Sequence, residues 1–252
     1  MNHSYLVDSH CHFFHIQNFK KCIPYIQKKN IRKILIPSIH IQDSYNNVAF
    51  AQKYSFVQVA VGIHPYYIPT SCPTEQLVHL CQQNKVIAIG EIGLDETSPF
   101  PLERQKKIFI EQLQIAQKFQ LPVLIHCRQY FGQLLEILQQ YYNPRGGILH
   151  SWSGSWEIAD LLIRKNYFIG VSPAFTNPNA KKRKSVIQKI PLQHIILETD
   201  SPYIPCMKIP KNYTTPLQIL EVVHALATIK QTTFSHIATE TSKNYFHLFN
   251  NT

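Results

Sequence analysis

Short apolar segments recur along the chain and alternate with longer segments whose apolar residues are three or four positions apart. Several of the short segments are β-branched and continuously apolar, which is typical of parallel strands that are covered on both faces. We expect strands at 5–7, 31–39, 56–63, 86–94, 121–125, 147–149, 167–171 and 194–197.

The longer segments predict amphipathic helices between these strands. The clearest covers 102–119, where an apolar stripe against Lys and Gln consists of Ile108, Phe109, Leu113, Ile115, Ala116 and Phe119. Further helices are expected at 44–54, 74–83, 132–141, 156–165 and 181–190, and two closing helices at 216–229 and 234–249. The chain contains no linker or low-complexity tract, so we predict one domain over residues 1–252.

Strands that alternate with helices predict a parallel sheet, which either closes into a barrel or stays open and doubly wound. Residues able to bind a metal follow strands spread over the whole chain, and only a closed barrel brings all these strand ends around one mouth. An open sheet would concentrate function at one switch point. The length of 252 residues also matches a barrel of about 250 residues. We therefore predict an α/β fold, a (β/α)8 TIM barrel of the metal-dependent hydrolase type.

The first strand closes with Asp8-Ser9-His10-Cys11-His12. Side chains alternate along a strand, so Asp8, His10 and His12 are expected on one side. Two imidazoles at this spacing can bind one metal ion, and the carboxylate below can orient them through hydrogen bonds. Taken alone, the pair also fits two surface histidines, so the interpretation depends on the later strands.

Five later strand ends carry residues of the same kinds. They read Gly62-Ile63-His64-Pro65, Ile89-Gly90-Glu91-Ile92-Gly93-Leu94-Asp95, Leu124-Ile125-His126-Cys127-Arg128, Leu149-His150-Ser151-Trp152-Ser153-Gly154 and Leu197-Glu198-Thr199-Asp200-Ser201-Pro202-Tyr203. Each has a simpler interpretation: His64 as a strand cap, Asp95 as the start of a loop, Glu198 as a solvated edge charge. Together they suit two divalent ions bridged by Glu91, with open positions for water and substrate.

Composition narrows the class of protein. Hydrophobic residues make up 44% of the chain, too many for a disordered protein, and no apolar run approaches the roughly 18 residues of a membrane-spanning helix. The N-terminus lacks a secretory signal, so we expect a cytoplasmic protein whose six cysteines are reduced thiols. Strand alternation turns Cys11 and Cys127 away from the site. The net charge of +10 favours polyanionic partners without establishing one.

The motifs, in this order, resemble the TatD family of metal-dependent deoxyribonucleases, within the amidohydrolase-like barrel superfamily. The resemblance runs from Asp8 to about Tyr203 and rests on Asp-x-His-x-His, Gly-Ile-His-Pro, Gly-Glu-Ile-Gly-Leu-Asp, Ile-His-Cys-Arg, His-Ser-x-Ser-Gly and Glu-Thr-Asp-Ser-Pro-Tyr. It implies two divalent metal ions, Mg²⁺, Mn²⁺ or Zn²⁺, and cleavage of single-stranded DNA from a 3′ end. The metal ligands that it implies are His10, His12, Glu91, His126, His150 and Asp200.

The resemblance also implies catalytic and substrate-binding roles. Asp200 would both bind a metal and accept the proton of the attacking water, and Glu91 would complete the catalytic pair. His64 and Arg128 would face the substrate phosphate.

Three segments beside these positions depart from the family pattern. Gln129 stands where an acidic residue is usual, and Glu96-Thr97-Ser98 where aromatic residues or His are usual. The segment Lys211-Asn212-Tyr213-Thr214-Thr215-Pro216 lacks the arginine of the usual Arg-Asn-x-Pro element. These departures concern the substrate side of the site and leave the metal ligands in place.

Other features of the rim have two interpretations each. Arg128 could instead form a rim ion pair with Glu103 or Glu136. The run Lys181-Lys182-Arg183-Lys184 is either a solvated helix face or a track for phosphates. Rim aromatics could stack exposed bases, although core packing is their more common role; they are Phe13, Phe14, Tyr66, Tyr67, Trp152 and Tyr203.

We therefore predict a two-metal hydrolase of phosphodiester bonds with nucleic acid as its substrate, no membrane association and no obligate protein partner. One alternative is a hydrolase of an ester or amide bond, such as the aminoacyl ester of tRNA, because the same attack by metal-activated water serves carbonyls. A second is a nucleic-acid-binding protein with a vestigial site. The intact ligand set argues against the second, since each buried polar ligand costs free energy without a metal.

Overall fold

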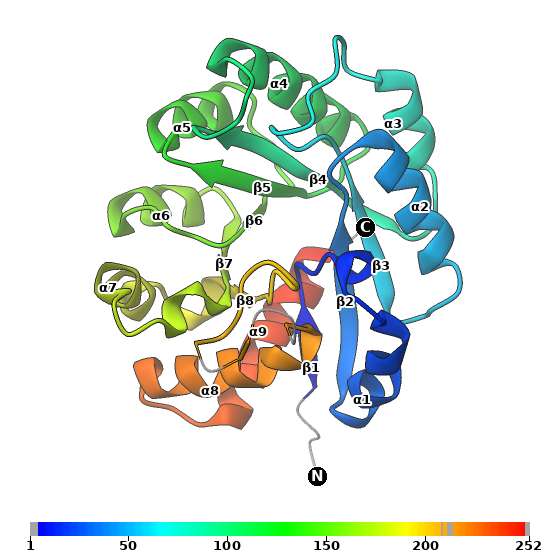
Figure 1. Cartoon of the computed structure of the whole chain (residues 1–252). Helices are drawn as coiled ribbons and strands as arrows, with labels where there is room; N and C mark the ends of the chain where they lie inside the picture. Colours follow the sequence, from blue (N-terminus) through cyan, green and yellow to red (C-terminus); the bar gives the residue numbers. More distant parts are fainter. Residues whose placement is uncertain (1–4, 208, 211–213, 250–252) are drawn as a thin grey trace.

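The computed structural model describes residues 5–207, 209–210 and 214–249. Eight parallel strands pair in chain order within one sheet, and all eight predicted strands are present (Figure 1). They are β1 (Leu6–Asp8), β2 (Ile31–Pro37), β3 (Val57–Val61), β4 (Val86–Asp95), β5 (Val123–Arg128), β6 (Gly147–Leu149), β7 (Tyr167–Val171) and β8 (Ile195–Leu197).

Backbone hydrogen bonds close the sheet between its first and last strands. Ser9 N donates to the Leu197 carbonyl at 3.0 Å, just beyond β1. Asp200 N donates to the His10 carbonyl at 2.8 Å, and a parallel bridge joins Cys11 to Ser201. The sheet is therefore a nearly closed barrel, which confirms the (β/α)8 prediction and excludes the open, doubly wound alternative.

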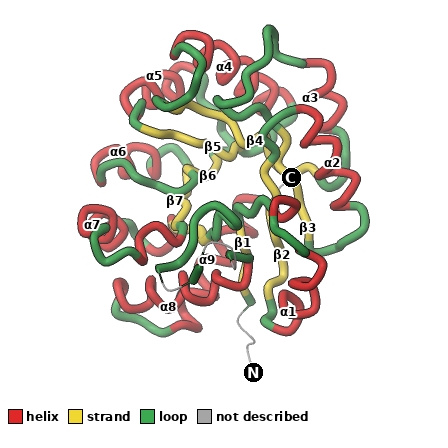
Figure 2. The backbone as a smooth tube through the Cα atoms, in the orientation of Figure 1, coloured by secondary structure: helices red, strands yellow, loops and turns green. Residues whose placement is uncertain are grey.

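Helices surround this barrel on the outside (Figure 2). They are α1 (Ile23–Lys28), α2 (Ile41–Ala51), α3 (Thr74–Cys81), α4 (Leu102–Lys118), α5 (Phe131–Gln140), α6 (Trp156–Ile163), α7 (Lys181–Lys189), α8 (Ile219–Lys230) and α9 (Phe234–Phe249). Short 3-10 turns cover Phe13–His15, Phe19–Cys22, Pro173–Thr176, Leu192–His194 and Pro216–Gln218.

Two differences from the predicted elements have local causes. The helix expected at 44–54 begins at Ile41, because the His40 side chain accepts a hydrogen bond from Asp43 N and caps the helix. The short helix α1 was not predicted, since only Ile26 of its six residues is buried and no apolar period is visible.

The barrel has an inner core that is separate from the layer between strands and helices. Every strand contributes to the inner cluster, which contains Val7, Leu35, Ala60, Ile87, Ala88, Leu124, Ile148, Phe168 and Ile196. Tyr245, Leu248 and Phe249 of α9 belong to the same cluster, and the Tyr245 hydroxyl donates to Gln58 at 2.8 Å. Helix α9, drawn in red beside β1 and β8, thus covers the amino-terminal end of the barrel and leaves the carboxyl ends for the site (Figure 1).

Asp8 has a different role from the one its position suggested. Its buried carboxylate accepts hydrogen bonds from Thr199 N at 2.9 Å, from the Thr199 hydroxyl at 2.6 Å and from the backbone of His10. Burial raises the pKa of Asp8 to about 8, against the opposing effect of these bonds. Asp8 therefore joins β1 to the end of β8, and the expectation that it orients the imidazole rings was wrong.

The cysteines are free thiols, as predicted. Cys11 is fully buried in the core between the strands and the helices. Cys127 packs against the same core, so neither thiol joins the site. Within the described part of the chain, no helix combines the length and apolarity that crossing a membrane requires.

Candidate functional site

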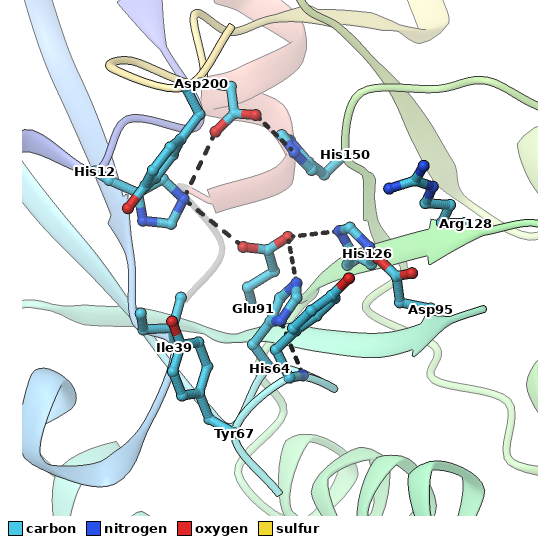
Figure 3. A pocket seen from close by; sticks show the side chains of 12 residues that line it. His12, Ile39, His64, Tyr67, Glu91, Asp95, His126, Arg128, His150 and Asp200 are labelled. Atoms are coloured by element: carbon cyan, nitrogen blue, oxygen red, sulfur yellow. Dashed lines mark hydrogen bonds and ion pairs between the residues drawn. The ribbon is translucent and has the colours of Figure 1, made fainter. Parts of the chain in front are cut away.

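A cleft of about 510 Å³ opens at the carboxyl ends of the strands (Figure 3). All the predicted ligands line it except His10, which is fully buried beneath it. The lining residues are His12, Ile39, His64, Tyr66, Tyr67, Glu91, Asp95, His126, Arg128, His150, Asp200 and Tyr203. The strand order of the barrel thus brings together residues that lie far apart in the sequence.

Four atoms form the first donor group: Nε2 of His10, Nε2 of His12, Oε2 of Glu91 and Oδ1 of Asp200. The two imidazole nitrogens are 3.2 Å apart. Glu91 lies 3.4 Å from His10 and 3.9 Å from His12, and Asp200 lies 3.8 and 3.6 Å from the same two nitrogens. Tetrahedral ligands with bonds of about 2.0–2.2 Å are about 3.3–3.6 Å from one another. Within this group the ligand atoms of His10, His12 and Glu91 all lie close enough to hold one ion, whereas Asp200 groups in the same way with His10 and His150.

The other oxygen of Glu91 faces a second donor group. Oε1 lies 3.0 Å from Nδ1 of His126 and 3.6 Å from Nε2 of His64. The two oxygens of this carboxylate thus point toward two different sets of donors, as Figure 3 shows. Two of the side-chain groups able to hold a metal, His10 with His12 and His64 with His126, therefore share Glu91.

His150 adjoins the first donor group. Its Nε2 lies 3.5 Å from Oδ2 of Asp200, and its ring stacks on that of His10 at 3.6 Å. On the far side of the ring, Nδ1 lies 3.0 Å from Oε1 of the fully buried Glu198, which also accepts from Ser151 N at 2.6 Å. Glu198 is therefore placed to orient His150, not to act as a solvated edge charge.

Asp95 is a functional residue that sequence reasoning missed. Its Oδ2 lies 2.7 Å from Nε2 of His126, so Nε2 can donate a hydrogen bond to this carboxylate. When the ring is neutral, Nδ1 then carries no hydrogen and its lone pair faces Glu91. The alternation that groups His10 with His12 also puts Asp95 on the same face of β4 as Glu91. That parity was the available signal; the strand end with Asp95 was counted among those able to bind metal, with the start of a loop as the simpler interpretation, but Asp95 itself was given no role.

Close contact between β4 and β5 brings these side chains together. The β5 strand runs to Arg128, beyond the predicted end at 125, because the long β4 offers pairing partners as far as Asp95. At Gly93 φ is +143°, and a Cβ would lie 1.9 Å from the His126 carbonyl. Glycine therefore permits the approach that places His126 against Glu91.

The protonation of His64 follows from its neighbour. Tyr66 N donates to Nδ1 of His64 at 3.2 Å, so the hydrogen of the neutral ring is on Nε2. Burial lowers the pKa of His64 to about 4, with Glu91 acting in the opposite direction. His64 thus presents a hydrogen-bond donor to the cleft, which suits contact with substrate better than binding of a metal through Nε2.

The carboxylates of the cleft remain charged. Burial raises the pKa of Glu91, but His10, His64 and His126 outweigh it and hold this pKa well below its usual value. For Asp200, burial is likewise outweighed by the nearby imidazoles, His150 above all, and the pKa is lowered.

His12 and His126 respond in opposite directions. Burial and His10 lower the pKa of His12 to about 3, so its ring is neutral. For His126 burial also lowers the pKa, but hydrogen bonds to Asp95 and Glu91 outweigh it and raise the pKa to about 8. His12 is therefore already in the neutral form that binds metal, whereas His126 would release a proton on binding one.

Three non-glycine residues with positive φ follow strands at this rim. The φ angles are 71° for Gln129, 44° for Ser151 and 48° for Asp200. Such angles are uncommon and cluster at functional sites, where they aim a side chain at some cost in stability. At Asp200 the backbone bond to His10 holds this conformation.

The remaining predicted rim residues divide into lining and core. Arg128 is exposed on the side of the cleft opposite His12, and the described residues give it no ion pair with Glu103 or Glu136 (Figure 3). Tyr66, Tyr67 and Tyr203 line the cleft and are exposed, whereas Phe13 and Trp152 are buried and Phe14 packs on Phe50.

Two sequence features do not contribute to the cleft described here. The run 181–184 begins α7 and none of its residues lines the cleft; its first two residues are exposed, but Arg183 and Lys184 are partly buried. The departure at 211–216 falls largely on Lys211, Asn212 and Tyr213, which lie outside the described residues.

Comparison with known proteins agrees with this geometry. The family model described as TatD related DNase matches residues 7–250. The uncharacterized metal-dependent hydrolase YjjV of Escherichia coli K12 is 31% identical over 97% of each chain, and YabD of Bacillus subtilis is 28% identical over 97% of this chain and 98% of its own. The crystal structure of YjjV superposes with a TM-score of 0.90 at 32% identity over 97% of this chain and 98% of its own. The chain therefore belongs to the TatD family of metal-dependent hydrolases.

Proposed function

We propose that this hydrolase cleaves the phosphodiester bonds of single-stranded DNA and removes nucleotides from the 3′ end. The arrangement of Glu91 is the observation that carries the proposal, because its two oxygens face two donor groups within one cleft. Such a pair of sites suits in-line displacement at phosphorus. The guanidinium of Arg128, which lines the cleft, and the DNase description of the family support a nucleic acid as the substrate.

The donor groups suggest how Mg²⁺, Mn²⁺ or Zn²⁺ would be held. His10, His12 and Glu91 would hold one ion, with His150 and Asp200 grouped around the same His10, and Glu91 with His126 would hold a second. Bound ions of this kind lower the pKa of water and neutralise developing charge. The donor chemistry fits, since Nε2 of His10 faces Glu91 and Nε2 of His12 faces Asp200, while the buried Nδ1 atoms of both rings have no hydrogen-bond partner among the described residues.

Asp200 would accept the proton of the attacking water and later return it to the leaving oxygen. Its carboxylate is charged, as a base requires, and it lies at the wall of the cleft next to His12 and His150. The backbone bond to the His10 carbonyl at 2.8 Å holds the main chain of Asp200 beside the end of β1.

His64 and Arg128 would bind the phosphate. The neutral His64 donates from Nε2, and the guanidinium of Arg128 can donate two parallel hydrogen bonds to phosphate oxygens. The exposed tyrosines of the rim, Tyr66, Tyr67 and Tyr203, offer ring faces on which unpaired bases can stack.

Asp95→Asn is expected to weaken metal binding by about 10–100-fold. Thr97 donates two hydrogen bonds to Oδ1 of Asp95, so an asparagine would place its oxygen there and its NH₂ against Nε2 of His126. His126 would then carry its hydrogen on Nδ1, the nitrogen that faces Glu91. Metal titration by calorimetry measures the change, with the exposed neighbour Glu96→Gln as the matched control. Equal affinities for wild type and Asp95→Asn would contradict this role.

A substrate panel tests the proposed function. Purified protein would be assayed with Mg²⁺, Mn²⁺ and Zn²⁺ on 5′-labelled single-stranded DNA, duplex DNA, RNA, aminoacyl-tRNA and bis(p-nitrophenyl) phosphate. We expect single-stranded DNA to shorten as a ladder from its 3′ end. Faster cleavage of aminoacyl-tRNA would favour the ester hydrolase instead, and metal-independent binding of DNA without any turnover would favour a vestigial site.

A further inference from the structure

The hydroxyl of Thr97 joins three strand ends at the mouth of the cleft. It donates to Oδ1 of Asp95, at the end of β4, over 2.7 Å. Nη1 of Arg128, the last residue of β5, lies 3.3 Å from the same oxygen, and the hydroxyl of Tyr66, in the loop after β3, lies 2.5 Å from it. Thr97 belongs to the segment in which this sequence departs from the family pattern.

Counting hydrogens fixes the direction of each bond. A threonine hydroxyl has one hydrogen and two lone pairs. Because Thr97 donates its hydrogen to Asp95, it accepts from both Arg128 and Tyr66. The Tyr66 hydroxyl is thereby a donor to Thr97, and one N–H of Arg128 is directed at the rim. The remaining N–H groups of Arg128 are left to face the cleft.

The contact to Asp95 does not depend on the hydroxyl alone. Thr97 N also donates to Oδ1 of Asp95, at 2.7 Å, and the Ser98 hydroxyl ties the same segment to the Pro65 carbonyl. Removing the Thr97 hydroxyl would therefore leave Asp95 and the loop in place. What it would remove is the acceptor for Arg128 and Tyr66.

We propose that Thr97 is a positioning residue that holds Arg128 in the orientation that binds a substrate phosphate and fixes the hydroxyl of Tyr66 beside it. The role rests on the proposed function at this site and adds a residue outside the ligand set. Arg128 has a long side chain and no ion pair among the described residues, so without an acceptor it would sample several orientations. Thr97 reduces this freedom before substrate arrives, which strengthens binding without a direct contact.

The test uses Thr97→Val, which keeps the shape of the side chain, and Thr97→Ser, which keeps the hydroxyl. One hydrogen bond of this kind corresponds to a change of about 3- to 10-fold. We expect KM for bis(p-nitrophenyl) phosphate to rise by that factor in Thr97→Val, with kcat and metal content unchanged, and Thr97→Ser to restore wild-type KM. In an Arg128→Ala background, Thr97→Val should have little further effect, because its partner is gone.

A binding measurement separates this proposal from the proposed function. Inorganic phosphate titrated into the metal-loaded protein should bind about 3- to 10-fold more weakly to Thr97→Val, whether or not phosphodiesters are hydrolysed. If the wild-type protein did not hydrolyse phosphodiesters but Thr97→Val still bound phosphate more weakly, the proposed function would be rejected and the role of Thr97 would stand. Unchanged phosphate affinity, absence of phosphate binding by wild type, a loss confined to kcat, or additive losses with Arg128→Ala would each overturn the role.

Discussion

Asp200→Asn should lower turnover by about 10²–10⁴-fold while oligonucleotide binding in the presence of metal falls much less. The substitution keeps the shape of the side chain but removes both the base and the charge that faces His10 and His12. His64 and Arg128 lie elsewhere in the cleft and would still bind the phosphate. Turnover and equilibrium binding would be measured on one oligonucleotide with saturating metal.

Glu198→Gln is the matched comparison for Asp200→Asn. Glu198 lies two positions earlier and contacts Nδ1 of His150 instead of the reacting groups. Its loss should act through the orientation of His150, with a decrease in turnover of about 10–100-fold. Near wild-type turnover in Asp200→Asn, or a larger loss in Glu198→Gln, would show that the proposed proton acceptor is wrong.

Glu91→Gln should abolish most metal binding as well as activity. The carboxylate is buried, charged and shared between the two donor groups, so the substitution removes negative charge from both. Charge stabilisation by bound ions contributes several kcal/mol to such reactions, so turnover should fall by about 10³-fold or more. Metal content by elemental analysis and turnover at saturating metal are the two measurements.

Glu96→Gln supplies the control, since it makes the same chemical change at an exposed position five residues along the chain. It should retain both metal and turnover. Thermal unfolding of the two variants without metal would show whether Glu91→Gln still folds. A folded Glu91→Gln with full metal content would mean that Glu91 does not bridge the donor groups.

The barrel could be predicted because its determinants are local and repetitive. Each strand is a short apolar run, each helix has its own period, and a parallel sheet with ligands at many strand ends has one closed arrangement. The clustering of His10, His12 and Glu91 followed from side-chain alternation and strand order. The contacts between individual atoms could not be predicted in this way, because alternation along a strand tells which face a side chain occupies but not which atom it contacts.

The errors and omissions have the same physical origin. Asp8 has the parity of His10, yet its carboxylate contacts Thr199, a neighbour created by barrel closure. Asp95 finds its partner His126 through the pairing of β4 with β5. The Thr97 hydroxyl meets Arg128 and Tyr66 because the ends of β4 and β5 and the loop after β3 converge. Such contacts depend on tertiary structure, and no local pattern in the sequence encodes them.

The first donor group draws its members from the beginning, the middle and the end of the barrel, so it cannot be complete early in the synthesis of the chain. A chain on the ribosome carries His10 and His12 from the start, but it lacks Asp200 until most of translation is complete. Beside these residues, where β1 meets the end of β8, Asp8 is hydrogen-bonded to Thr199, 191 positions away. Contacts between residues so far apart in the sequence have a high entropic cost of loop closure. Hydrolytic capacity would therefore arise together with closure of the barrel, and nascent or partly folded chains would carry the histidines without the chemistry.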